Sequence, residues 1–340
     1  MGLPIDVWLS GSAPEASTRA AQLRALGVDG VFTFEGPNDV FFPLVAASRV
    51  PELSLMTNVA MAFPRSPVHL AHAAYDLHLL SDGRFRLGLG SQIRAHIEKR
   101  YGSTWSRPVE RMRDTVLAVK AVLRSWQTGE RLDHRGPFWR HTLMPPQFSP
   151  GPNPCGVPPV LVGALGPRMT EMAAQVADGL LVMPFNSARH YRERTLPAVA
   201  AGLDGSERPF EIVAEAIVAM GTTDAEIEVA RRAVRNLLAF YGSTPAYRPV
   251  LEVEGRAGLQ PELNALSKQG RWPEMAARID DDLVDAIAVS GTPAACAATI
   301  RERFGDTISR VCCYFPGYPV ADAAIAELAA ALRGGAVSRS

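Results

Sequence analysis

Apolar, strand-like runs alternate with helical patterns from one end of this chain to the other, and this alternation constrains the fold most. Repeated strand–helix units imply a parallel sheet covered by helices. Eight units fit a TIM (β/α)8 barrel. A doubly wound sheet is the alternative, but the first strand is not followed by the Gly-x-Gly-x-x-Gly turn typical of that fold. The eight predicted strands are residues 5–9, 30–34, 53–61, 85–89, 159–164, 180–183, 212–220 and 309–315.

The helices between these strands have recognisable starts. Ser66 precedes a helix predicted over 67–80, and Thr223 and Glu226 form a capping box that opens another helix. Two stretches interrupt the alternation. Residues 128–157 are rich in Pro and Gly and predict a loop or small hairpin, whereas 241–290 mix short helical pieces with loops. Because no linker and no fixed-period repeat is visible, we predict one domain, residues 1–340, with these two insertions.

The composition argues against several classes of partner. Basic and acidic residues balance at 35 each among 340 residues, without a long basic run, which disfavours nucleic acid or an anionic membrane as the main partner. The four cysteines and seven histidines lack metal-ligand spacing, so no metal is predicted. No segment is apolar for long enough to span a bilayer and no signal peptide is visible, which predicts a cytoplasmic protein. Arginine far outnumbers lysine, as in proteins from GC-rich genomes such as those of actinobacteria.

Residues 159–182 predict a strand, a glycine-containing turn and a helix that starts at Pro167. Proline suits the first helical turn because its missing N–H would have no partner there. Gly163 and Gly166 let backbone N–H groups approach a ligand, and the helix dipole favours an anion at that place. The turn is therefore a candidate phosphate site, with an ordinary strand–helix crossover as the alternative.

In a TIM barrel the active site lies at the carboxyl ends of the strands. Glu35 follows the apolar run 31–34, so its carboxylate is predicted at the rim of the barrel interior, where it could exchange a proton with a substrate. The alternative is a capping or ion-paired acid. Asp39 precedes a short helix and is predicted to cap it. Candidates for an aromatic wall over a planar ring, with core packing as the alternative, are Phe41, Phe42 and Trp105.

Four segments in order resemble the bacterial luciferase-like superfamily of flavin and deazaflavin oxidoreductases, above all the branch that uses coenzyme F420. They are residues 27–48, 55–102, 105–126 and the crossover 162–182, and the likeness extends over roughly 3–335. The resemblance implies a TIM-barrel enzyme in which coenzyme F420, or FMN as the alternative, exchanges a hydride with a small organic substrate.

The resemblance also implies where the cofactor lies. It places a non-proline cis peptide at Asn58–Val59, behind the ring. His96 is the second acid or base candidate beside Glu35, and for both His96 and Arg94 the alternative is a surface position on a helix. The predicted cofactor-binding residues are Asn58 and Val59 behind the ring, Gly90, Ser91, Gln92 and Arg94 after the fourth strand, and Gly163, Ala164, Leu165, Gly166 and Arg168 at the phosphate.

Other functions stay open at this point. One is an FMN-dependent monooxygenase on the same fold, and another is a barrel that binds a flavin or deazaflavin without turnover. A metal-dependent hydrolase is disfavoured by the absent ligand spacing. Relatives are often homodimers through the second and third helices, and a homodimer is predicted here too. Small residues that would allow close packing at such an interface are Ala46, Ala71, Ala73 and Ala74.

Overall fold

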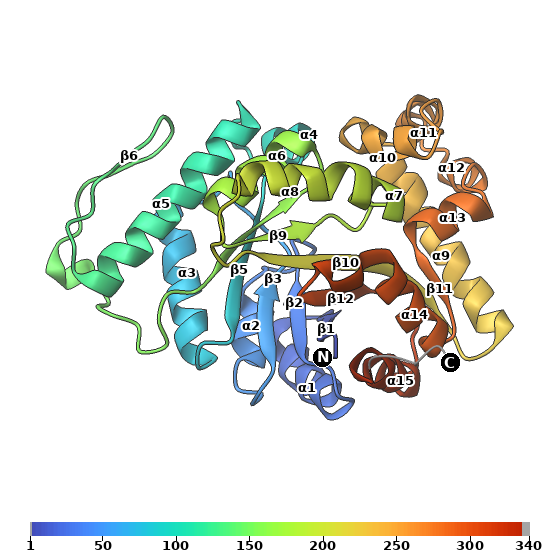
Figure 1. Cartoon of the computed structure of the whole chain (residues 1–340), viewed down its shortest axis with the longest axis horizontal. Coiled ribbons are helices and arrows are strands. Elements are labelled where there is room, and N and C mark those ends of the chain that lie inside the picture. The colour runs from blue at the N-terminus through green and yellow to red at the C-terminus, as the bar shows by residue number, and fades with distance from the viewer. Residues whose placement is uncertain (1, 335–340) are drawn as a thin grey trace.

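The computed structural model describes residues 2–334 and contains a closed barrel of eight parallel strands. β1 (Ile5–Trp8) pairs with β2 (Gly30–Thr33) on one side and with β12 (Arg310–Tyr314) on the other, which closes the sheet. Figure 1 shows the strands in the middle of the molecule and helices around them. The predicted TIM barrel is confirmed, and an open doubly wound sheet is excluded. The remaining barrel strands are β3 (Ser54–Thr57), β5 (Phe85–Gly90), β8 (Val160–Ala164), β9 (Gly179–Val182) and β10 (Glu211–Met220).

Two short strands extend the barrel at its carboxyl end. β4 (Ala60–Met61) continues the chain after β3 and pairs with β5. β11 (Val289–Gly291) pairs with the last residues of β10, which is the longest strand of the sheet. The sequence predicts one strand over 53–61, whereas the structure has two, β3 and β4, separated by residues 58 and 59.

The helices begin where their start signals predict. Ser66 Oγ accepts a hydrogen bond from the Val68 N–H at 3.3 Å at the start of α3, and Thr223 and Glu226 form the predicted capping box of α9. None of the helices within residues 2–334 is long and apolar enough to cross a membrane. The helices around the barrel are α1 (Ala13–Ala25), α2 (Phe42–Ala47), α3 (Pro67–Leu80), α5 (Pro108–Thr128), α6 (Pro167–Val176), α8 (Leu196–Leu203), α9 (Asp224–Gly242), α14 (Pro293–Phe304) and α15 (Asp322–Arg333).

The small residues proposed for a subunit interface are only partly available. Ala71 and Ala74 of α3 are fully buried in the chain's own core. They therefore do not offer the surface for helix packing between subunits that the sequence suggested, because the barrel uses the same face. The homodimer itself stays a prediction.

The first insertion contains a hairpin, as the Pro- and Gly-rich sequence of 128–157 predicts. The buried carboxylate of Asp114 in α5 fastens it, since Asp114 Oδ2 accepts hydrogen bonds from the Phe138 N–H at 2.7 Å and the Trp139 N–H at 2.8 Å. Figure 1 shows this segment beside α5, at the left of the view. The hairpin strands are β6 (His134–Arg135) and β7 (Arg140–His141).

The second insertion, residues 241–290, is mainly helical. Its buried side chains form one hydrophobic cluster with Ile217 and Ala219 of β10 and with Phe185, which follows β9. Because this cluster includes residues at the strand ends, the insertion packs on one side of the barrel mouth (Figure 1, orange). Its helices are η3 (Pro245–Tyr247), α10 (Arg248–Val253), α11 (Leu259–Lys268), α12 (Trp272–Ala277) and α13 (Asp281–Ile287).

Alternate residues of the strands fill the barrel interior in layers, as is usual in this fold. Toward the amino ends, Arg310 forms a buried ion pair with Asp6, and Arg86 Nε lies 2.9 Å from Glu211 Oε2. Above these pairs lies an apolar layer. Because side chains occupy both layers, ligands can meet the barrel interior at the carboxyl ends of the strands. The apolar layer consists of Phe32, Met56, Leu161, Leu181, Val213 and Cys312.

Candidate active site

Aromatic rings line the carboxyl ends of the first, second and last strands. Trp8 and Phe34 stack with their ring centroids 5.0 Å apart, and Tyr314 meets both rings edge-on at 5.4 and 5.8 Å. All three rings pack on the apolar layer of the barrel. They form the aromatic surface of the mouth, a role that the sequence suggested for other residues. Of those, Phe41 lies under the Arg65 guanidinium, Phe42 is 65% exposed, and Trp105 packs on Phe63.

A buried carboxyl group lies at the same level of the barrel. Glu215 of β10 follows the interior residue Val213 by two positions, so its side chain shares the inward face of the strand. It is only 8% exposed. Burial raises the pKa of Glu215 to about 8, against the opposing effect of a hydrogen bond that Asn58 Nδ2 donates to Glu215 Oε2 at 2.9 Å. Glu215 is therefore protonated at neutral pH.

Two tyrosines of the second insertion lie near enough to Glu215 to feel its charge. Burial, followed by the charge of an ionised Glu215, raises the pKa of Tyr247 to about 12 and holds the pKa of Tyr241 well above its usual value. Both phenols thus keep their protons at physiological pH and offer neutral O–H groups. Phe185 completes this side of the mouth, with its ring centroid 6.0 Å from that of Tyr241 and 5.8 Å from that of Tyr247.

Asn58 and Val59, which lie between β3 and β4, form a bulge in the third strand of the barrel. The Asn58–Val59 peptide bond is cis, as the family resemblance implied. The Val59 side chain occupies the space in front of two glycines: a Cβ on Gly163 would lie 3.0 Å from Val59 Cγ1, and a Cβ on Gly90 would collide with Val59 Cγ2. Gly163 therefore makes room for Val59. This differs from the expectation that Gly163 lets backbone approach a ligand, because the space over its Cα is taken by protein.

The turn after β8 leads into α6. Gly166 is its N-cap, with φ −72° and ψ 147°, and nothing in the described structure lies within 4 Å of where its Cβ would be. No side chain caps this helix. Within residues 2–334, neither the Gly166 N–H nor the Arg168 N–H donates to a protein acceptor. Of the other predicted residues of this turn, Ala164 and Leu165 are buried and the Arg168 side chain is exposed.

The loop after β5 carries the next group of predicted residues. Gln92 has a positive φ of 58°, and its Oε1 accepts a hydrogen bond from the Ile93 N–H at 3.0 Å. Ser91 Oγ donates to the Gln92 carbonyl at 3.2 Å. In α4 (Arg94–Lys99), the Arg94 side chain is 72% exposed and pairs with Glu98 at 2.9 Å, while His96 is half-buried. These contacts of Arg94 favour its surface alternative.

Glu35 lies at the centre of a polar network at the rim. Its side chain is 6% exposed and forms an ion pair with Arg65. Glu35 Oε1 accepts the Met61 N–H at 3.0 Å, and Oε2 accepts the Tyr101 hydroxyl at 3.2 Å. Burial and the neighbouring Glu35 carboxylate raise the pKa of Tyr101. Glu35 thus connects the loop after β2 to β4 and to the loop after α4.

Asp39 lies two residues before Phe41, the N-cap of α2, so it is not the N-cap itself, but its side chain accepts hydrogen bonds at the start of the helix. Its Oδ1 accepts hydrogen bonds from the N–H groups of Phe41 at 2.8 Å and Phe42 at 3.3 Å, at the start of α2.

Sequence reasoning missed Glu215, Trp8 and Tyr314. Glu215 had a detectable signal, since it is the one acid inside the apolar run 212–220 and alternates with inward-facing residues. Trp8 and Tyr314 belong to strands recognised as such, but only closure of the barrel brings the first and last strands together. Among residues 2–334, no group of three or more His, Cys, Asp or Glu side chains is placed to hold a metal ion.

Comparison with known proteins agrees with this architecture. The family model described as luciferase-like monooxygenase matches residues 6–310. An uncharacterised protein of Mycobacterium tuberculosis is 45% identical over 311 residues, covering 89% of this chain and 92% of that protein. A second protein of the same species, provisionally named a coenzyme F420-dependent oxidoreductase, is 29% identical over 310 residues, covering 86% of this chain and 88% of that one.

Among solved structures, the coenzyme F420-dependent tetrahydromethanopterin reductase of Methanopyrus kandleri superposes with a TM-score of 0.77 at 18% identity, covering 96% of this chain and 97% of that one. At that identity the likeness shows a shared fold. The family model covers most of the chain, and the first relative spans nearly its whole length. The chain therefore belongs to the luciferase-like monooxygenase family.

Proposed function

We propose that this protein is a coenzyme F420-dependent oxidoreductase that exchanges a hydride between the deazaflavin and a small organic substrate. The observation that carries the proposal is the neutral Glu215 carboxyl, buried at the barrel mouth beside Asn58 and the aromatic rings. A hydride transfer to a carbonyl or imine also needs a proton, and a protonated acid at the reacting face supplies it.

The residues present fit such a cofactor. The open space at Gly166 and the free N–H groups of Gly166 and Arg168 at the start of α6 suit a phosphate. The Val59 side chain and the mouth of the barrel present an apolar surface on which a flat ring can lie. When bound, the reduced deazaflavin supplies the hydride.

Glu215 is our candidate for the proton transfer. Because Glu215 Oε2 accepts from Asn58, the proton of the neutral carboxyl sits at Oε1, where it can be donated to a substrate oxygen or nitrogen. Asn58 fixes the orientation of the carboxyl and is a positioning residue. Glu35 and His96 remain alternative candidates for the acid or base, and turnover of variants at these positions tests them. The contacts of Glu35 with Arg65 and Met61 support a positioning role for Glu35.

An FMN-dependent monooxygenase on the same fold is the second candidate, favoured by the description of the family model. The two cofactors imply different reactions, because carbon at ring position 5 largely removes the reactivity of the reduced ring with oxygen. Titrating the apo-protein with F420 and with FMN tests the proposal. We expect F420 to bind more tightly; tighter binding of FMN, with oxygen consumption by the reduced complex, would support the monooxygenase. A barrel that binds F420 but turns over no substrate would be the non-catalytic alternative.

The phosphate assignment predicts the effect of Gly166→Val. Valine tolerates the backbone angles of Gly166 and meets no protein atom there, so the fold should persist. Its side chain would cover the N–H groups at the start of α6, so F420 affinity in a fluorescence titration should fall about tenfold or more, as for the loss of a charge-assisted hydrogen bond.

Gly258→Val is the matched control. Gly258 is the N-cap of α11, and its Cβ position is also free of protein atoms within 4 Å. F420 should bind this variant like the wild type. Equal affinities of the Gly166 and Gly258 variants for F420 would remove the phosphate assignment.

A further inference from the structure

Three tyrosines gather beside the buried Glu215 carboxyl, and they come from separate segments of the chain. Tyr241, near the end of α9, and Tyr247 of η3 pack on the hydrophobic cluster of the second insertion, with their ring centroids 5.6 Å apart. Ile217 belongs to the same cluster and follows Glu215 by two positions on β10, so both side chains point to the same side of the strand. Tyr314 of β12 also packs on this cluster and pairs in register with Ile217. The carboxyl and the three phenols therefore share one part of the barrel mouth.

The hydroxyl groups of these three tyrosines are not used by the protein itself. Burial, followed by the charge of an ionised Glu215, raises the pKa of Tyr314 as it does for the other two, so all three hydroxyls lie near the carboxyl. Within residues 2–334 none of them donates to a protein acceptor, whereas the hydroxyls of Tyr101, Tyr191 and Tyr318 have protein partners. None of the three oxygens is among the enclosed polar atoms of residues 2–334 that lack a partner. The three hydroxyls are therefore open to a ligand.

This part of the mouth carries no net charge at neutral pH. Glu215 and the phenols are protonated there, and no lysine or arginine of the described chain shifts the pKa of any of the four. An anionic substrate group would therefore meet no cation beside Glu215, and a cationic iminium would meet no carboxylate. The stacked rings of Trp8 and Phe34 adjoin Tyr314 and offer a flat apolar surface. The site thus suits an uncharged polar group on a flat apolar body.

We propose that Tyr241 is a second hydrogen-bond donor to the substrate beside Glu215, and that the substrate is an uncharged ketone or aldehyde with a flat apolar body. This inference rests on the proposed function. Tyr241 lies at the centre of the group, because its ring meets those of Phe185 and Tyr247 and its hydroxyl also lies near that of Tyr314. A carbonyl oxygen has two lone pairs and accepts from both donors, whereas an imine nitrogen has only one.

The two donors act on the same oxygen in different ways. The carbonyl carbon takes the hydride, the electrons of the C=O π bond move to the oxygen, and Glu215 donates its proton to that oxygen. The products are the alcohol, the oxidised cofactor and a Glu215 carboxylate, which takes up a proton from the solvent. Tyr241 keeps its proton throughout and stabilises the negative charge that develops on the oxygen.

The test compares three substrates of related shape with reduced F420, whose oxidation is followed by absorbance. They are acetophenone, its carboxylate analogue benzoylformate, and the cyclic aryl imine dihydroisoquinoline. The wild type should reduce acetophenone with the highest kcat/KM. Tyr241→Phe should lower this kcat/KM about tenfold or more, the scale for a lost donor to a developing oxyanion. Its F420 affinity should stay at the wild-type value, and its kcat should still fall above about pH 8, because Glu215 is intact.

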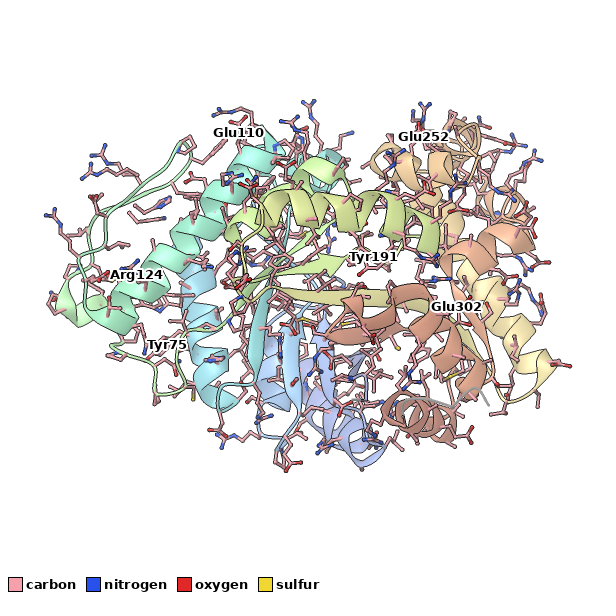
Figure 2. The ribbon with its side chains drawn as sticks, in the orientation of Figure 1. Tyr75, Glu110, Arg124, Tyr191, Glu252 and Glu302 are labelled. Atoms are coloured by element: carbon pink, nitrogen blue, oxygen red, sulfur yellow. The ribbon has the colours of Figure 1, made fainter. Side chains whose placement is uncertain are left out.

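Tyr75→Phe is the matched control. Figure 2 shows Tyr75 on α3, at the left of the view, whereas the second insertion lies at the upper right. This variant should reduce acetophenone like the wild type, and Tyr247→Phe should lose less activity than Tyr241→Phe.

Four results would overturn the inference and leave the proposed cofactor standing. They are wild-type kcat/KM in Tyr241→Phe, a larger loss in Tyr247→Phe, a wild-type preference for the keto acid or the imine, and turnover of none of the three substrates by a protein that binds F420. Failure of the wild type to bind F420 would instead overturn the proposed function.

Discussion

Glu215→Gln should lower kcat about 100-fold or more in the direction that reduces the substrate, the usual scale for loss of a general acid. Glutamine keeps the shape and can still accept the Asn58 hydrogen bond, but it carries no transferable proton. Cofactor affinity should change little, because Glu215 faces the barrel interior, away from the phosphate turn. Steady-state turnover with a verified substrate measures the effect, and F420 titration provides the binding control.

The wild-type enzyme should also show the pKa of this group. The acid is active while protonated, so kcat for substrate reduction should be level at neutral pH and fall as the pH rises through about 8. This decrease in kcat at high pH should be absent in Glu215→Gln. Glu35→Gln and His96→Asn belong in the same experiment. If Glu215→Gln turns over normally while one of these two loses activity, the proton-transfer role passes to that residue.

The thermal stability gives a check on Glu215 that needs no substrate. Its pKa in the folded protein, about 8, lies above the ordinary value of 4.5. The folded state therefore holds this proton more tightly, so the contribution to stability is fully present below about pH 4.5 and is lost as the pH rises to about 8. The Glu215→Gln variant has no carboxyl group here to ionise, so its stability should not decrease in this way. Above pH 8 it should have a higher melting temperature than the wild type.

Gly90→Ala should be the most damaging of the small substitutions at the site. The added methyl group would collide with Val59 Cγ2, and Val59 cannot retreat freely because it also packs in front of Gly163. Overpacking of this kind costs about 1–3 kcal/mol. We expect a lower melting temperature and at least about tenfold weaker F420 binding, since the displaced Val59 would intrude where the ring is proposed to lie.

A second substitution should reverse part of this damage. Val59→Ala alone should lower F420 affinity modestly through lost apolar contact. Combined with Gly90→Ala it removes the colliding methyl groups, so the double variant should be more stable than Gly90→Ala alone, a non-additive result expected only of residues in contact. Gly36→Ala is the control, because a Cβ there meets its nearest atom, in Phe34, at 3.7 Å. Simple addition of the two single effects would contradict the packing argument.

Most of the barrel could be predicted because its determinants are local. Each strand is an apolar run, and several helices begin at recognisable capping residues, such as Ser66 and Thr223. The break between β3 and β4 was less visible, because residues 58 and 59 are as compatible with a strand as their neighbours. The cis bond at that point came from family resemblance, since nothing in the local sequence requires it.

The site could be predicted only in outline, because its properties depend on residues far apart in the sequence. Glu35 follows β2, but its ion-pair partner Arg65 lies 30 positions further along the chain, so the sequence around Glu35 does not show that its carboxylate is paired. Asn58 and Glu215 are 157 positions apart and meet only across the closed barrel. Gly163 looked like a ligand-binding glycine, although the side chain it accommodates, Val59, lies on another strand.

The length of β10 has a mechanical consequence. This one strand carries Glu211 in the charged layer, Val213 in the apolar layer, Glu215 at the mouth, and Ile217 and Ala219 in the core shared with residues 241–290. The helices of residues 241–290 therefore pack on the same strand that carries Glu215, our candidate proton donor, and that reaches the charged layer at the other end of the barrel. We expect residues 241–290 to discriminate between substrates by shape. We also expect the distance between these helices and Glu215 to stay constant while the surrounding loops move.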